Sequence, residues 1–130
     1  QRAEASALLS SASRTYEQAA QSQQDCPAGR RIYPKVGDVA DRAVVDRLAP
    51  ELRAAGFIVP PTEVVPPRKM PAATEVRFFR KDEESGARDA TAALARAGLP
   101  GVPARYMKGY EDSTSIRPCH YELWLLAPAP

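Results

Sequence analysis

The sequence is poor in the residues that most often build catalytic and metal centres. Its 130 residues include one histidine, two cysteines and no asparagine. A single histidine excludes a histidine pair for catalysis or metal binding within one chain, and two distant cysteines exclude a Cys-x-x-Cys redox motif and a four-cysteine zinc site. Without asparagine, acyl-phosphate hydrolysis by an arginine and an asparagine is also excluded. We therefore expect a noncatalytic protein with no cofactor and no metal.

The chain also lacks a strong excess of charge and a long apolar run. Eighteen basic and sixteen acidic residues are interspersed and give a formal net charge of +2, so no field of one sign would gather nucleic acid or anionic lipid. No apolar run approaches the roughly 20 residues of a membrane span. We expect no nucleic-acid partner, and membrane attachment only through a segment upstream of Gln1. A start at Gln1, without an initiator methionine, indicates a processed chain or an excised piece.

The two cysteines, Cys26 and Cys119, lie far apart in the sequence. They could form a disulfide in an oxidising compartment, or they could be two small buried hydrophobic residues in a reducing one. Both alternatives stay open at this point.

The length predicts one domain with one modest core. A helical segment is expected to precede it. From Ala3 to about Ser22, apolar residues recur at helical spacing among Ser, Gln, Arg and Glu, a pattern typical of an amphipathic helix. Pro27 and Gly29 end this pattern. We therefore divide the chain into an N-terminal helix with its linker, residues 1–28, and an α+β domain, residues 30–127.

Within the domain the sequence repeats with a period of about 42 residues. Leu94 follows Leu52 and Gly98 follows Gly56 at this spacing, which indicates two similar βαβ halves. The expected order is strand 31–36, helix 39–55 and extended segment 57–65, then strand 75–80, helix 82–97 and segment 104–110. A last strand, 120–126, has no counterpart in the first half.

Prolines modify this plan at three places. Pro34 argues for an edge position of the first strand, because proline has no backbone N–H to donate. Pro50 predicts a kink or a fresh helix start near Leu48. Five prolines between residues 60 and 73 predict an exposed, stiff connection between the halves.

The strand Glu75-Val76-Arg77-Phe78-Phe79-Arg80, the Ala-rich helix ending in Ala97-Gly98 and the closing His120-Tyr121-Glu122-Leu123-Trp124-Leu125 resemble the LytR C-terminal type of domain. The resemblance covers about residues 31–126. More distantly, the chain is similar to SPOR peptidoglycan-binding domains. One departure is Val36-Gly37-Asp38, where the LytR-type pattern tends to place an Asn-Gly turn, so a ligand role of that turn is not carried over.

The resemblance implies a ferredoxin-like or SPOR-like α+β fold, with a tandem βαβ repeat, an antiparallel sheet and two helices on one face. It also implies a bacterial envelope protein in the periplasm or another extracytoplasmic location, with an accessory role and no cofactor.

Strand alternation predicts candidate ligand-binding residues on the sheet face away from the helices. Such a face can stack rings while polar groups orient a ligand. The alternative is that the N-terminal helix covers this face. A long polar loop, Lys108 to Pro118, adds two further candidates, although it could equally be an irregular hairpin connection. The candidates are Tyr33, Arg77, Phe79, His120, Glu122 and Trp124 on the sheet, and Tyr110 and Arg117 in the loop.

We therefore expect a noncatalytic extracytoplasmic module that binds an envelope glycan, peptidoglycan or a partner protein. The alternative is a structural, regulatory or sensory domain that oligomerises, with the N-terminal helix as a stalk or as the interface of a homodimer.

Overall fold

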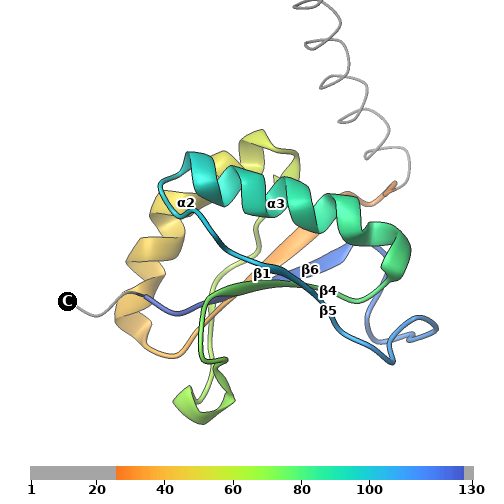
Figure 1. Ribbon diagram of the computed structural model, residues 1–130. Coiled ribbons are helices and arrows are strands. Elements are labelled where there is room, and N and C mark those ends of the chain that lie inside the picture. Colours follow the sequence, from red (N-terminus) through yellow and green to blue (C-terminus); the bar gives the residue numbers. More distant parts are fainter. Residues whose placement is uncertain (1–25, 128–130) are drawn as a thin grey trace, which may run out of the picture.

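The computed structural model describes residues 26–127 and has a mixed α+β fold. Two helices pack side by side on one face of a six-stranded sheet (Figure 1). The strands are β1 (Arg30–Val36), β2 (Phe57–Ile58), β3 (Glu63–Val64), β4 (Glu75–Phe78), β5 (Ala104–Tyr106) and β6 (His120–Leu125). The helices are α2 (Arg42–Ala54) and α3 (Glu84–Arg96), with the short 3-10 helices η1 (Val39–Asp41), η2 (Pro67–Lys69) and η3 (Lys81–Glu83).

The predicted internal repeat is confirmed. Each half places a strand before a three-residue 3-10 helix and an α-helix of 13 residues, and then returns to the sheet. Each α-helix is followed by a glycine with a left-handed backbone, Gly56 with φ 94° and Gly98 with φ 98°. Only glycine adopts this conformation at little cost, so these two residues end the helices at equivalent points.

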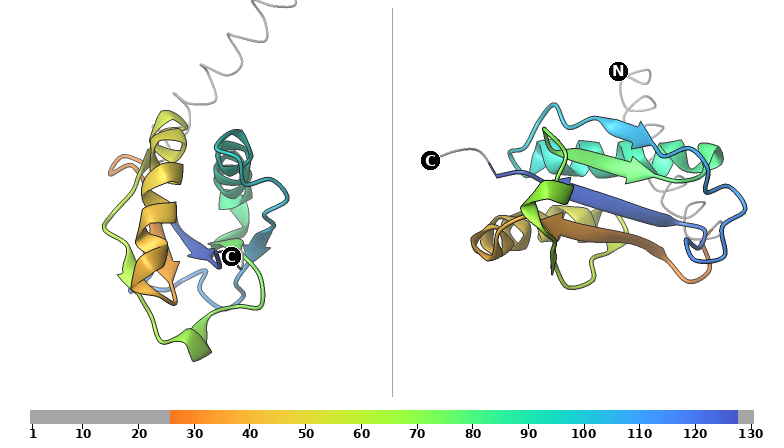
Figure 2. Two further views of the ribbon diagram at one scale, coloured as in Figure 1. Left: turned by 90° about the vertical axis from the view of Figure 1, so that its left-hand side faces the viewer. Right: turned by 90° about the horizontal axis from the view of Figure 1, so that it is seen from below.

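The prediction of an antiparallel sheet is wrong, because the sheet is mixed. The strand order is β2-β1-β6-β4-β5, with β3 also paired to β1 (Figure 2). Only β4 and β6 pair antiparallel; β1 is parallel to β2, β3 and β6, and β4 is parallel to β5. Each helix returns the chain beside the strand it left, and this crossover makes adjacent strands parallel. The last strand, β6, is inserted between the two halves.

The hydrophobic core lies between the sheet and the two helices. The fully buried Ile32, Leu123 and Val76 come from the three central strands, and Leu52 and Leu94 come from equivalent positions of α2 and α3. The predicted division of strand residues between two faces is confirmed along β1 and β6, where buried and partly exposed positions alternate.

The edge position predicted from Pro34 and the fresh helix start predicted near Pro50 are both wrong. β1 is not an edge strand, since it has neighbours on both sides. Pro34 is nevertheless tolerated, because it lies between the positions paired with β2 and those paired with β3. No new helix starts near Pro50, which lies within the continuous helix α2. The carbonyl group that loses its helical donor is that of Asp46, an exposed residue, so water can take the place of the missing donor.

The N-terminal helix predicted for residues 3–22 lies outside the described residues, as does its proposed position across the sheet. No helix between residues 26 and 127 has the length and apolar character needed to cross a membrane.

Candidate functional site

The sheet face opposite the helices carries a compact group of polar and aromatic side chains. Because β6 lies between β1 and β4, three adjacent strands contribute to this face. Across the strands, Glu122 is level with Tyr33 on one side and with Arg77 on the other. We call this group the outer platform. Its members are Tyr33, Lys35, Glu75, Arg77, His120, Glu122 and Trp124.

Glu122 is the centre of the outer platform. Its Oε2 lies 2.8 Å from His120 Nε2, and its Oε1 accepts a hydrogen bond of 2.9 Å from Trp124 Nε1. Burial by itself would raise the pKa of Glu122, but the hydrogen bonds with His120 and Trp124 outweigh it and lower this pKa below its ordinary value. The carboxylate therefore fixes the two rings that flank it along β6.

Arg77 joins the Trp124 ring to a second carboxylate. Its guanidinium lies 4.1 Å from the centre of the indole ring, a cation–π contact. Its Nε donates to Glu75 Oε2 at 2.6 Å, and Arg105 lies 3.4 Å from the other oxygen of Glu75. Glu75 is only 7% exposed, and these two arginines balance its charge.

A row of rings continues from the platform toward the loop between β5 and β6. Tyr33 stacks on His120 with 4.6 Å between ring centres. Phe79 touches His120 and Tyr110 edge-on, with 5.2 Å between centres in both contacts. Phe79 is buried, whereas Tyr110 is exposed. Phe79 therefore supports the two rings beside it, and Tyr33, His120 and Tyr110 have surface open to solvent.

The platform is ordered by its own contacts, although it keeps a solvent-facing surface. The side chains of Lys35, Arg77, His120 and Glu122 are 17%, 16%, 19% and 13% exposed. Residues held by mutual bonds lose little additional side-chain entropy when a ligand binds. The arrangement is thus suited to rigid recognition of a ligand that presents an apolar face and polar groups together.

Most of the predicted site residues lie together. Tyr33, Arg77, His120, Glu122 and Trp124 are on the platform, and Tyr110 reaches it through Phe79. Arg117 is exposed in the loop, and none of the contacts above involves it.

Two residues important to this surface were missed at the sequence level. Strand alternation could have placed Glu75 beside Arg77, two residues along the same strand. Arg80 contacts the backbone of a loop more than 30 residues away, and no local pattern predicts such a contact.

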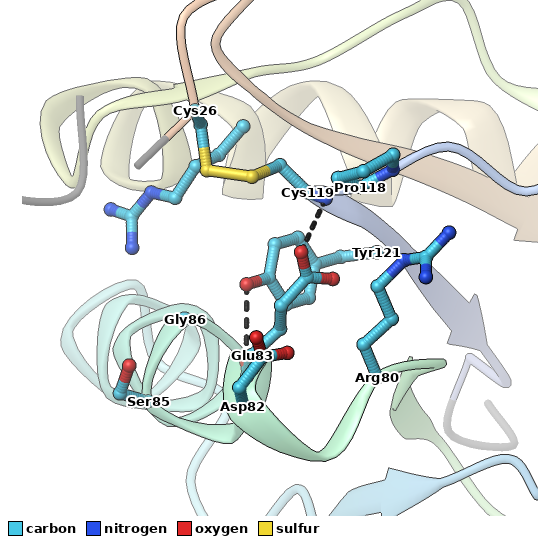
Figure 3. Close-up of a pocket in the computed structure, with 10 residues that line it drawn as sticks. Cys26, Arg80, Asp82, Glu83, Ser85, Gly86, Pro118, Cys119 and Tyr121 are labelled. Carbon is cyan, nitrogen blue, oxygen red and sulfur yellow. Dashed lines mark hydrogen bonds between the residues drawn. A yellow bond between two sulfur atoms is a disulfide. The ribbon is translucent and has the colours of Figure 1, made fainter. Parts of the chain in front are cut away.

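A hollow lies near the amino-terminal end of α3 (Figure 3). Its volume is about 550 Å³. Its lining comes from the first described residues, from the β4–α3 connection and from the start of β6: Cys26, Arg30, Arg80, Asp82, Glu83, Ser85, Gly86, Pro118, Cys119 and Tyr121.

Glu83 connects the walls of this hollow. Its Oε2 accepts a 2.7 Å hydrogen bond from the Cys119 backbone N–H, and its carbonyl oxygen accepts one of 3.1 Å from the Tyr121 hydroxyl (Figure 3). Burial raises the pKa of the Glu83 carboxyl group. Glu83 Oε1 and Arg80 Nε are buried and have no hydrogen-bond partner among the described residues.

The same region contains a disulfide between Cys26 and Cys119, with 6.0 Å between their Cα atoms. The two cysteines are therefore bonded to each other, a point that the sequence alone left open. The bond ties the linker before β1 to the residue that precedes β6, and so to the end of the platform where His120 lies.

Between residues 26 and 127, no cluster of three or more His, Cys, Asp or Glu side chains could hold a metal ion. Comparisons of the chain with family models, with curated proteins and with solved structures gave no match. The geometry of the platform therefore provides the main basis for a functional proposal.

Proposed function

We propose that this domain is a noncatalytic binding module of a bacterial envelope protein, and that the outer platform is its recognition surface. One observation carries the proposal: His120, Glu122, Trp124 and Arg77 form a single bonded array across adjacent strands. Such an array offers ring surfaces for stacking beside polar groups that fix the orientation of a ligand.

The proposed ligand is peptidoglycan, through its glycan strand. A sugar ring has an apolar face of C–H groups and a rim of hydroxyl groups, which matches rings flanked by planar polar side chains. The platform carries two basic residues, Lys35 and Arg77, and two acidic residues, Glu75 and Glu122, so its charge is balanced. This balance disfavours a polyanion such as nucleic acid. The disulfide supports an extracytoplasmic location, since disulfides persist in oxidising compartments.

The proposal can be tested by co-sedimentation of the chain with purified peptidoglycan sacculi. We expect the wild-type chain to be retained, and Trp124→Ala to weaken retention by about ten-fold or more, as for a central aromatic contact. Val39→Ala is the matched control, because Val39 is 61% exposed and belongs to η1, outside the platform. It should bind like the wild type.

Tyr33→Ala provides a second variant, on the neighbouring strand β1, should Trp124→Ala prove unstable. Equal retention of both platform variants and the wild type would contradict the proposed surface. Sacculi that do not retain the chain, together with an envelope protein that does bind it, would show that the glycan is the wrong ligand. If the chain binds neither sacculi nor an envelope protein and binds only a cytosolic protein, the envelope function itself is wrong.

A further inference from the structure

The segment between β5 and β6, residues 107–119, contains no helix or strand. It extends from one end of the sheet (Figures 1 and 2). Loops of this length without regular structure are uncommon in compact domains and are often functional. The contacts that hold this loop therefore bear on recognition at the adjacent platform.

One side chain, Arg80, bonds to three backbone carbonyl groups of the loop. Its Nη2 donates to the carbonyl oxygens of Ser113 at 3.2 Å and Ile116 at 2.9 Å, and its Nη1 donates to that of Glu111. A guanidinium has several donors in a fixed planar arrangement, which the single ammonium group of lysine cannot reproduce. Arg80 thus determines the path of the loop backbone between residues 111 and 116.

The Glu111 side chain provides a second attachment, in which a side chain of the loop bonds to residues outside it. Its Oε1 accepts hydrogen bonds from the Lys81 backbone N–H at 3.0 Å and from the Tyr106 hydroxyl at 2.8 Å. The loop therefore bonds to two consecutive residues that follow β4, Arg80 and Lys81. The preceding residue, Phe79, contacts both Tyr110 of the loop and His120 of the platform.

We propose that Arg80 is a positioning residue for recognition, which holds the loop so that Tyr110 extends the row of rings on the outer platform. The inference rests on the proposed function, since it assigns the loop a part in binding the same ligand. Arg80 acts through the loop backbone and does not itself contact the ligand. Tyr110, which is 38% exposed, presents the contact surface.

The test combines hydrogen exchange with retention on sacculi, using Arg80→Lys in the full chain. We expect amide protection in residues 108–116 to fall by about ten-fold, because the three carbonyl bonds cannot all be kept. Retention on sacculi should fall while protection in β1 and β6 stays unchanged. Arg88→Lys is the matched control, since the Arg88 side chain is exposed on α3, where it pairs with Glu84 of the same helix. It should alter neither measurement.

Tyr110→Ala tests the same idea without disturbing Arg80, and should reduce retention while the rest of the loop keeps its protection. A loosened loop with undiminished retention would show that Arg80 is merely structural and overturn the proposal. Unchanged loop protection in Arg80→Lys would also overturn it. Failure of the wild-type chain to bind sacculi is a separate result, which would contradict the proposed function and, with it, the role of the loop.

Discussion

The backbone of Gly86 in α3 lies against the phenol group of Tyr121 in β6. A Cβ atom on Gly86 would overlap the Tyr121 hydroxyl oxygen and lie 2.6 Å from Cζ. Both residues are buried. The absence of a side chain at residue 86 therefore sets how closely α3 can approach the sheet, next to the hydrogen bond from Tyr121 to Glu83.

Gly86→Ala should destabilise the domain, although alanine is the better helix former by about 1 kcal/mol. We expect a net loss of about 1–3 kcal/mol in the free energy of unfolding, since the added methyl group must displace the phenol ring. Urea denaturation measures this loss. Ser85→Ala, at the exposed neighbouring position, should change stability by less than about 0.5 kcal/mol. A Gly86→Ala variant more stable than wild type would refute the close approach.

Arg30 should resist conservative replacement. It is 5% exposed, its guanidinium lies 4.2 Å from the centre of the Phe57 ring, and it donates to Asp89 and to the Ala55 carbonyl group at 2.9 and 2.5 Å. These contacts join β1 to both helices. Arg30→Lys should cost about 1–3 kcal/mol, because one ammonium group cannot maintain both bonds and the ring contact. Equal stability of the lysine variant in urea would contradict this role.

Removal of the disulfide should destabilise the domain by about 3–5 kcal/mol, because the bond closes a loop of many residues in the unfolded chain. The sequence separation of the cysteines is 93. Thermal or urea unfolding of Cys26→Ala/Cys119→Ala, compared with the oxidised chain, measures the loss. A difference below about 1 kcal/mol would contradict the expectation for a loop of this length.

The backbone at Cys119 allows a sharper version of this experiment. Cys119 has a φ of 64°, a left-handed conformation that costs a residue with a Cβ atom about 1 kcal/mol relative to glycine. The pair Cys26→Ala/Cys119→Gly should therefore be more stable than Cys26→Ala/Cys119→Ala. The opposite order would mean that the turn before β6 has a different backbone conformation.

Glu122 should contribute to the acid dependence of stability. Its folded-state pKa is lowered below the ordinary value of 4.5, so its stabilising contribution is present above that pH and is lost as pH falls through the folded pKa. The stability difference between wild type and Glu122→Gln should therefore shrink on acidification, as measured by urea unfolding from pH 7 downward. Asp46→Asn, at an exposed position on α2, is the control. A difference that grows as pH falls below about 5 would contradict the hydrogen-bonded array.

Periodicity was sufficient to predict much of the fold. Helical spacing and the 42-residue repeat identify α2 and α3, and alternation in β6 separates Leu123, which faces the core, from Glu122 and Trp124, which face outward. Strand direction could not be obtained in the same way, because alternation is identical in parallel and antiparallel strands. The mixed sheet depends on where β6 is inserted, which is a choice among long-range pairings.

The strand residues of the candidate site were predictable from the sequence, whereas its contacts with the loop were not. Alternation brings Tyr33, Arg77 and Glu122 to one face once their strands are neighbours, and this part of the site follows from the sequence. The contacts of Arg80 with the loop and of Glu83 with Cys119 join segments more than 30 residues apart. They depend on the three-dimensional path of the loop, which no local propensity determines.

The central claim, that the outer platform binds peptidoglycan, can be tested most directly by NMR titration with soluble peptidoglycan fragments. Because the chain contains one tryptophan, its spectrum has a single indole N–H resonance, that of the Trp124 Nε1 group bonded to Glu122. The account predicts that this resonance shifts progressively with added fragments, together with the amides of Tyr33 and Arg77. Fragments that bind while the indole resonance stays fixed, with shifts confined to α2 and α3, would contradict it.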